Sequence, residues 1–241
     1  MEKKNAYHIF PLGDAAATID LGNIVCSSLN QKVLAMQAWI EKHAFEGLKD
    51  TIVGYSSLSI LYDPVTILRK QKLKSTAYEF VKSILESSFS ASLELKSDNG
   101  SEIHLPVCYD EMFAPDLASI AASKNFDRED VINIHLSRVY RVYMMGFLPG
   151  FAYMGDVDER IQLPRKDKPE NVTAGSVGIA NAQTGIYPLD SPGGWQIIGR
   201  TPVKLFNPQA IQPVKLKSGQ FIRFHRISTA EFEEISISQM F

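Results

Sequence analysis

Two arginines and one histidine have the side chains and the neighbours that chemistry needs. Arg165 stands in the segment LPRKDKP and Arg200 in IGRTP, so nearby prolines restrict the backbone that carries each guanidinium. A planar guanidinium can hold a carboxylate or a phosphate through two parallel hydrogen bonds. His135 stands where a predicted helix meets a predicted strand, and its ring can titrate near neutral pH. We take His135 and Arg200 as candidate catalytic residues and Arg165 as a candidate ligand-binding residue; surface arginines and a structural histidine are the plain alternatives.

A second set of residues could present polar and aromatic groups to a small ligand. Gln183, Thr184 and Tyr187 stand in the segment AQTGIYP and offer an amide, a hydroxyl and a phenol. The turn at Gly175 and Ser176 could direct backbone amides at an anion. Aromatic rings that stand close to glycines favour a pocket wall or a partner surface over an ordinary core position. The candidates of this kind are Phe147, Phe151 and Trp195.

Two glycine-containing segments approach known motifs without matching them. Residues 194–201 (GWQIIGRT) nearly fit the phosphate-binding P-loop, but arginine replaces its lysine and a proline follows where a helix should begin. Residues 174–178 (AGSVG) lack the spacing and the following helix of a nucleophile elbow. We expect a strand ending in a turn at the first segment and a tight turn at the second. The five histidines show no ligand spacing, so we expect no metal site.

Most of these candidates lie in one stretch, residues 146–202. Glycines and prolines punctuate it too often for a helix, and its aromatic residues are too numerous for a flexible linker. The pattern predicts short strands joined by tight turns, with glycine wherever another group packs close to the backbone. Loops on such a rigid β scaffold are a common place for a binding site.

The elements on either side of this stretch predict two domains, 1–97 and 98–241, with the boundary in the polar segment KSDNGS. The first reads as an α+β domain, with helices on one face of a mostly antiparallel sheet, and the second as mainly β. The strands expected in the first domain are 7–10, 15–20, 51–55 and 58–63, and its helices are 28–44 and 75–89. The second adds strands at 102–108, 138–145, 203–206 and 220–226, helices at 115–124 and 127–135, and an end that is helical over 229–234 and β-like afterwards.

Composition excludes several classes of partner. The formal net charge of the 241 residues is -2, so nothing indicates nucleic acid or an anionic membrane. The start of the chain lacks the apolar core of a signal peptide, and no apolar run is long enough to span a membrane. Cys26 and Cys108 fit no metal or redox spacing and are expected to be reduced. These features favour a cytoplasmic protein.

Four blocks of the stretch resemble the family of the 5-oxoprolinase B subunit, also called allophanate hydrolase subunit 1, which includes the kinase inhibitor KipI. The blocks are GFLPGFAY at 146–153, AGSVGI at 174–179, QTGIYP at 183–188, and SPGGW at 191–195 with IGRTP at 198–202. A weaker resemblance extends over the whole chain. This sequence departs from the family after Tyr109, where a glycine-containing segment is more usual, and at Leu136, where a small hydroxyl residue is more usual.

The resemblance implies an N-terminal α+β domain followed by a cyclophilin-like β-barrel, and a role as one member of a three-part complex. The partners would be a second cyclophilin-like protein, similar to the C subunit of 5-oxoprolinase, and a LamB/YcsF-like protein, similar to its A subunit. Together they would open 5-oxo-L-proline to L-glutamate at the expense of ATP. Because the sequence has no P-loop, we expect ATP to bind at a non-standard site or with a partner, and the isolated chain to be inactive.

Two other functions stay open at this stage. The KipI resemblance implies a binding module that inhibits a sensor histidine kinase. A further resemblance, to the carboxyltransferase part of urea carboxylase, implies a carboxyltransferase-like subunit of urea or allophanate metabolism. That reaction would need a biotin-bearing partner, since this chain has no biotin-attachment Met-Lys pair.

Overall fold

A computed structural model describes residues 7–71, 75–93 and 101–238. The chain separates into two compact units, Met1–Asn99 and Gly100–Phe241, and each has a hydrophobic core. The predicted boundary between residues 97 and 98 lies outside the described residues. Across the described ranges, no helix is both long and apolar enough to cross a membrane.

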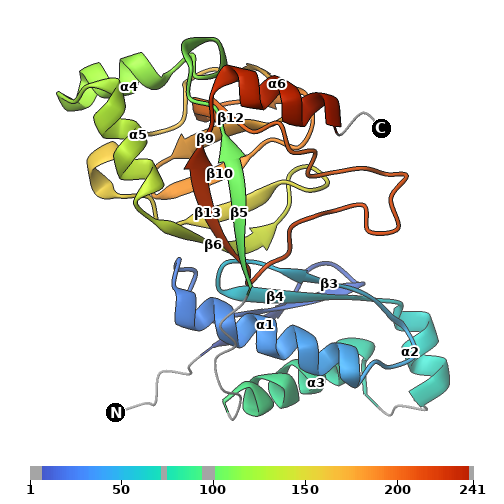
Figure 1. The fold of residues 1–241 in the computed structure, drawn as a ribbon. Helices are drawn as coiled ribbons and strands as arrows, with labels where there is room; N and C mark the ends of the chain where they lie inside the picture. Colours follow the sequence, from blue (N-terminus) through green and yellow to red (C-terminus); the bar gives the residue numbers. More distant parts are fainter. Residues whose placement is uncertain (1–6, 72–74, 94–100, 239–241) are drawn as a thin grey trace, which may run out of the picture. The chain divides into compact units, whose positions relative to one another are not determined.

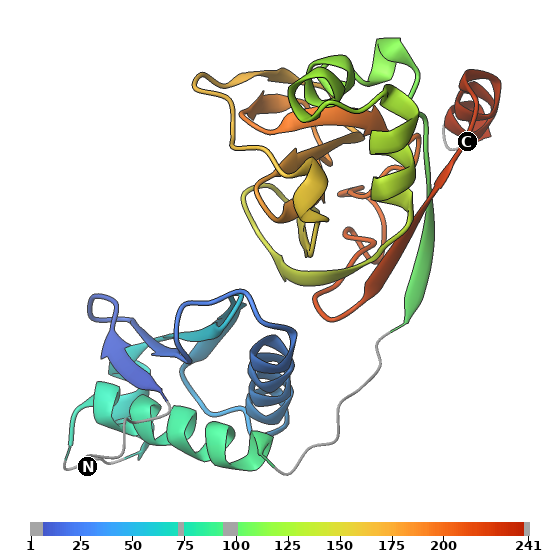
Figure 2. The ribbon, with the colours of Figure 1, turned by 90° about the vertical axis from the view of Figure 1, so that its left-hand side faces the viewer.

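The first unit is a four-stranded antiparallel sheet with helices on one face (Figures 1 and 2). The strand order is β1-β2-β4-β3. In chain order the elements are β1 (His8–Pro11), β2 (Ala16–Asp20), α1 (Ser27–Lys42), β3 (Leu48–Val53), β4 (Ser57–Tyr62), α2 (Pro64–Gln71) and α3 (Ala77–Ser92). The four predicted strands and two predicted helices of this half are confirmed in type, with shifts at their ends.

The core of the first unit follows directly from its sequence periodicity. In β4 alternate residues are buried, among them Leu58 and Ile60, because successive side chains of a strand point to opposite faces. In α1 the buried Val33, Met36 and Ile40 recur at helical spacing and pack into the same cluster. The helices therefore cover the apolar face of the sheet.

Helix α2 is an element that we did not predict. We expected the strand to end at the pair Asp63-Pro64, but the carboxylate of Asp63 accepts hydrogen bonds from the amides of Val65 and Thr66 and from the Thr66 hydroxyl. These bonds cap a helix whose first residue is Pro64, a position that tolerates proline because its amide would have no partner.

The second unit contains a seven-stranded sheet that curls into a half-barrel, with the order β12-β9-β10-β7-β6-β13-β5 (Figure 2). Strands β11 and β8 pair with each other in a separate two-stranded sheet. The elements are β5 (Glu102–Val107), η1 (Glu111–Phe113), α4 (Leu117–Lys124), α5 (Arg128–Leu136), β6 (Val139–Met145), β7 (Ala152–Gly155), η2 (Glu159–Ile161), β8 (Glu170–Val172), β9 (Ser176–Ala180), β10 (Gln183–Ile186), β11 (Ser191–Gly193), β12 (Gln196–Arg200), β13 (Phe221–Arg226) and α6 (Thr229–Ser238). Six of these strands fall between residues 146 and 202, which confirms the prediction of short strands there.

The two outer strands of this sheet, β12 and β5, meet at one residue pair. Cys108 directly follows β5 and exchanges two backbone hydrogen bonds with Arg200 at the end of β12, with N···O distances of 2.8 and 2.9 Å. The bridge therefore connects the edges of the curled sheet beside one of our candidate residues.

Two predicted strands of the second unit are wrong. Residues 203–206 form no strand; Phe206 makes only an isolated bridge to Val214, in a segment where prolines 202 and 208 lack amide donors. The end of the chain is helical from Thr229 to Ser238 and not only to residue 234; the Ser228 hydroxyl and the Glu231 carboxylate form reciprocal capping bonds at the start of this helix, α6. Residues 239–241, the rest of the expected β-like end, lie outside the described residues.

Candidate functional site

The predicted site residues form three groups in the second unit instead of one. His135 and Thr184 meet inside the core, in a chain of hydrogen bonds. Phe147, Phe151, Tyr187 and Trp195 form an aromatic cluster, with Arg165 beside it. Arg200, Gly175 and Ser176 lie together where β9 and β12 pair. Gln183 begins β10 with a half-buried side chain and belongs to none of these groups.

His135 lies in the last turn of α5 and is completely buried. The helix begins with the predicted capping box, in which Asp127 and Asp130 each accept a hydrogen bond from the other's amide. The imidazole stacks against Tyr140 and Phe224, with ring centroids 5.1 and 5.0 Å away. The ring is thus held by aromatic groups of the core.

The hydrogen bonds of His135 fix which nitrogen carries the proton. The Thr184 hydroxyl donates its only proton to the carbonyl oxygen of Gly178, 3.0 Å away, since a carbonyl can only accept. Thr184 Oγ1 must then accept from Nε2 of His135, at 3.3 Å. Nδ1 is left to accept from the hydroxyl of Tyr109, at 3.0 Å.

Burial keeps this chain of groups neutral. It lowers the pKa of His135 to about 3 and raises the pKa of Tyr109 well above its ordinary value, because charge is unfavourable away from water. A neutral, fully bonded and buried ring has no route to a ligand in this conformation. The geometry therefore favours a structural role for His135, and its catalytic role stays a prediction without support from its position.

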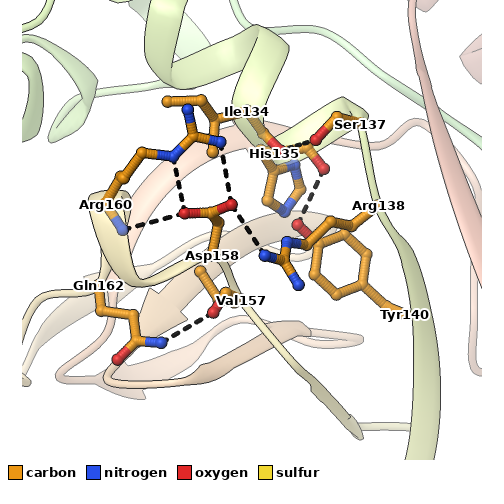
Figure 3. A network of polar contacts seen from close by, with 9 residues as sticks. All are labelled: Ile134, His135, Ser137, Arg138, Tyr140, Val157, Asp158, Arg160 and Gln162. Carbon is orange, nitrogen blue, oxygen red and sulfur yellow. Dashed lines mark hydrogen bonds and ion pairs between the residues drawn. The ribbon is translucent and has the colours of Figure 1, made fainter.

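A carboxylate that we did not predict, Asp158, lies next to this buried region (Figure 3). It accepts hydrogen bonds from Arg138, at 2.8 Å, and from the side chain of Arg160, at 2.9 and 3.0 Å. The bonds from Arg160, and then those from Arg138, lower the pKa of Asp158. In the same view, the Tyr140 hydroxyl donates to the backbone carbonyl of His135. The network thus fixes the junction between α5, β6 and η2.

Three of the predicted aromatic residues form a closed cluster instead of an open wall. Phe151, Tyr187 and Trp195 are at most 4% exposed, and their rings meet edge to face with centroids 5.1 and 5.4 Å from Phe151. The absence of a side chain at Gly185 makes room for them, since a Cβ there would lie 2.9 Å from the Trp195 ring and 3.0 Å from that of Phe151. The prediction that glycine stands where a group packs close to the backbone is confirmed at this position.

Phe147 is the predicted aromatic residue that reaches the surface. Its side chain is 61% exposed, and its ring meets the edges of Phe151 and Tyr187. Its φ of 67° lies in the left-handed region, which is strained for a bulky side chain. Such strain is often found at functional positions, so Phe147 keeps its place among the candidate ligand-contacting residues.

Arg165 is held over the aromatic cluster by its neighbour Lys166. The Lys166 ammonium pairs with Asp116 at 2.8 Å and with Glu170 at 2.6 Å, and its amide donates to the Gly194 carbonyl. The guanidinium carbon of Arg165 lies 5.9 Å from the Trp195 ring centroid. No carboxylate of the described residues pairs with Arg165 within 4 Å, so its charge is available to a ligand.

Arg200 lies half-buried beside the bridge between β5 and β12. Its Nε donates to the Ala174 carbonyl at 2.8 Å, while the Ala174 amide donates to Asp190 at 2.7 Å. Burial lowers the pKa of Arg200, and the charge of Asp190 opposes this effect. Within the described ranges, no carboxylate pairs directly with its guanidinium. A partly desolvated cation without a carboxylate partner can bind an anion.

The turn next to Arg200 cannot serve as the anion cradle that we expected. The amide of Gly175 donates to the Tyr187 carbonyl at 2.7 Å, and the amide of Ser176 donates to the Thr173 carbonyl at 3.1 Å. Both donors are therefore occupied inside the chain. Gly175 has a φ of 87° and lies against the Thr201 carbonyl, which explains the glycine without a ligand.

The described residues offer anion-binding groups but no metal centre. No three His, Cys, Asp or Glu side chains gather there closely enough to hold a metal ion. Residues 194–201 contain strand β12, as predicted, and not a loop that opens a helix, so they form no P-loop. What remains is two arginines that could hold a carboxylate or phosphate, and one exposed, strained phenylalanine.

Comparison with known proteins gives the chain its relatives. The family model "Carboxyltransferase domain, subdomain C and D" matches residues 7–216. The B subunit of 5-oxoprolinase from Bacillus subtilis (strain 168) is 40% identical over 228 residues, which cover 94% of this chain and 95% of that protein. The solved structure of TTHA0988 aligns with a TM-score of 0.75 at 30% identity, covering 88% of this chain and 40% of that one. The conserved uncharacterized protein PH0987 from Pyrococcus horikoshii aligns with a TM-score of 0.54 at 41% identity, covering 93% and 100%.

Proposed function

Because the chain belongs to the family of the 5-oxoprolinase B subunit, we propose that it is the B subunit of an ATP-dependent 5-oxoprolinase that opens 5-oxo-L-proline to L-glutamate. The observation that carries the proposal is the similarity to such a B subunit along nearly the whole length of both chains. The fold also supports the proposal. The curled seven-stranded sheet would correspond to the cyclophilin-like barrel expected for this family.

Opening of the 5-oxoproline ring could use a positively charged side chain that is held in a fixed position. 5-Oxoproline carries a carboxylate and an unstrained lactam, whose carbonyl must be activated before water can attack it. A guanidinium that holds the carboxylate would orient the lactam without taking part in bond breaking. Arg200 is the best candidate, because its Nε is anchored to Ala174 and its charge is partly desolvated. Arg165, which is exposed and held over Trp195, is the alternative.

ATP does not fit a standard site in the described residues, which offer neither a P-loop nor a metal cluster. We therefore propose that ATP binds at a non-standard site or with a partner of this chain. The partners of the proposal are a second cyclophilin-like subunit and a LamB/YcsF-like subunit, and the isolated chain is inactive. The expected cytoplasmic location accords with two free cysteines, Cys26 and Cys108.

Reconstitution of the complex tests whether the activity needs all three proteins. The chain is co-purified with the two proposed partners, and ATP-dependent formation of glutamate from 5-oxoproline is measured. We expect turnover by the three-part complex, none by the chain alone, and an increase in KM for 5-oxoproline in Arg200→Gln. Full ATP-dependent turnover by the single chain would contradict the proposal that the activity needs all three proteins. A complete complex without turnover would contradict the enzyme function.

The description of the family model as a carboxyltransferase domain favours one second candidate. The chain would then be a carboxyltransferase-like subunit of urea or allophanate metabolism, supplied by a biotin-bearing partner. Transfer of a carboxyl group from carboxybiotin, measured in the same reconstituted complex, distinguishes it from the ATP-dependent lactamase. Inhibition of a sensor histidine kinase stays a prediction from the sequence, with kinase autophosphorylation as its assay.

A further inference from the structure

We propose that Phe232 of the C-terminal helix α6, together with Phe113 of η1, is a positioning residue that holds the guanidinium of Arg200 ready for an anionic ligand. The inference rests on the proposed role of Arg200 in binding the substrate carboxylate. It adds an element, α6, in which the sequence indicated no site residue. The residues matched by the family model end at 216, so α6 lies beyond the matched domain.

The two phenylalanine rings form an apolar support for the arginine. Phe113 and Phe232 stack with centroids 4.3 Å apart and an interplanar angle of 29°, and each residue is 8% exposed. The guanidinium carbon of Arg200 lies 6.0 Å from the first centroid and 5.7 Å from the second. These distances are at the outer limit of about 6 Å for a cation–π attraction, so the two rings together give the guanidinium a weak attraction and an apolar contact on one side.

The remaining contacts of Arg200 fix it from the other sides. Its backbone is bound in both directions to Cys108, and its Nε donates to the Ala174 carbonyl. Among the described residues, none accepts a hydrogen bond from its terminal nitrogens or forms an ion pair with them. Those nitrogens can therefore form the paired hydrogen bonds that a carboxylate or phosphate accepts from a guanidinium.

Helix α6 is itself anchored to the segment that carries Phe113. The Thr229 hydroxyl donates to the Asp110 carboxylate, which directly precedes η1. Ser228 and Glu231 form reciprocal capping bonds at the start of α6, with distances of 2.7 and 3.3 Å. The ring of Phe232 is thus placed by two independent contacts and does not depend on Arg200 for its position.

The test uses the full chain and two readouts. The first is the NMR signal of the Arg200 Nε–H group, assigned by its loss in Arg200→Gln; a bond to Ala174 protects it from exchange. The second is KM for 5-oxoproline in the reconstituted complex. Phe232→Leu keeps an apolar side chain but removes the ring, while Phe232→Ala is the stronger change. The matched control is Phe221→Leu, which removes a ring beside a different arginine, Arg141.

We expect Phe232→Leu to weaken the protection of the Nε–H signal and to raise KM by about 2- to 30-fold with kcat nearly kept. The control should change neither, and Phe232→Leu should add nothing in an Arg200→Gln background. Unchanged protection and KM in Phe232→Leu overturn the inference, as does an equal loss of activity in both backgrounds. If Arg200→Gln itself leaves KM unchanged, the proposed role of Arg200 fails, and the Nε–H signal alone decides whether Phe232 positions the guanidinium.

Discussion

Nε2 of His135 donates to Oγ1 of Thr184 over 3.3 Å, and this contact joins the end of α5 to the start of β10. The Thr184 proton is already used on the Gly178 carbonyl, so the direction of the bond is settled. A histidine that sequence reasoning marked as a candidate catalyst is thereby part of a buried structural chain. The contact predicts how the protein responds to acid and to substitution.

The stability of the second unit should fall with acid through His135. Its pKa is about 3 when folded and about 6.5 in an unfolded chain, so between these values only the unfolded state binds the proton. The free energy of unfolding therefore decreases as pH falls through this window, by up to about 1.4 kcal/mol per pH unit. The free energy of unfolding can be measured with denaturant at about pH 7 and about pH 5. It should change less between these two pH values in His135→Gln than in the parent chain.

Two substitutions of Thr184 should distinguish how much its shape and how much its hydrogen bonds contribute to stability. Thr184→Val keeps the shape but leaves the Nε2–H donor of His135 without its acceptor, which should cost about 1–3 kcal/mol of unfolding free energy. Thr184→Ser keeps the hydroxyl and should cost less. Thermal and denaturant melts of both variants measure the difference. Equal stability of the two variants would show that the bonds contribute nothing.

Local signals in the sequence were sufficient for most elements but not for all. The apolar stripe of α1 and the Asp127 and Asp130 capping box of α5 lie within a few residues, so both helices were predicted. The cap at Asp63 is equally local and is a signal for α2, but a proline directly after a run of alternating apolar residues is also typical of the end of a strand. Residues 203–206 needed a partner strand to become one, and no local pattern shows whether a partner is present.

The candidate site was less predictable because its contacts join distant segments. His135 and Thr184 are 49 residues apart, and the ring that supports Arg200 comes from Phe232. Such pairs depend on strand register and on the curl of the sheet, which single-sequence periodicity does not contain. The residue types were informative, since aromatic residues near glycines indicated close packing. Whether a given ring faces a ligand or the core needed the structure.

Packing around Gly185 should be sensitive to a single methyl group. A Cβ at this position would lie 2.9 Å from Trp195, 3.0 Å from Phe151 and 3.0 Å from the carbonyl of Ala152. Gly185→Ala should therefore destabilise the second unit by about 1–3 kcal/mol and change the emission of Trp195. In the matched variant Gly194→Ala the nearest atom lies 3.6 Å away, so little change is expected. Both variants are made in a Trp39→Phe background, and their denaturant unfolding is followed by the fluorescence of Trp195. Equal unfolding curves for Gly185→Ala and Gly194→Ala would contradict the tight packing.

Loss of the Asp158 carboxylate should loosen the junction between α5, β6 and η2. Asp158→Asn keeps the size of the side chain but weakens its bonds to Arg138 and Arg160, and should lower the unfolding free energy by about 1–3 kcal/mol. Because hydrogen bonds from these arginines lower its pKa, Asp158 stabilises the fold above the unfolded pKa, and this contribution is lost as pH falls through the folded pKa. The difference between parent and variant should therefore shrink in strong acid. A difference that stays constant from neutral to strongly acidic pH would show that the charge is not responsible.

Phe147 should contribute more to function than to stability. Its left-handed backbone costs about 1–2 kcal/mol for an ordinary side chain, whereas asparagine adopts this conformation more readily. Phe147→Asn should therefore melt within about 1 kcal/mol of the parent chain, since the relieved strain offsets the lost contacts with Phe151 and Tyr187. If the exposed ring contacts a ligand or a partner protein, the same variant should lose ATP-dependent turnover or assembly in the reconstituted complex. Leu189→Asn, at another exposed apolar residue, is the control and should keep both. A Phe147→Asn protein that is markedly less stable but fully active would assign the strained ring to folding alone.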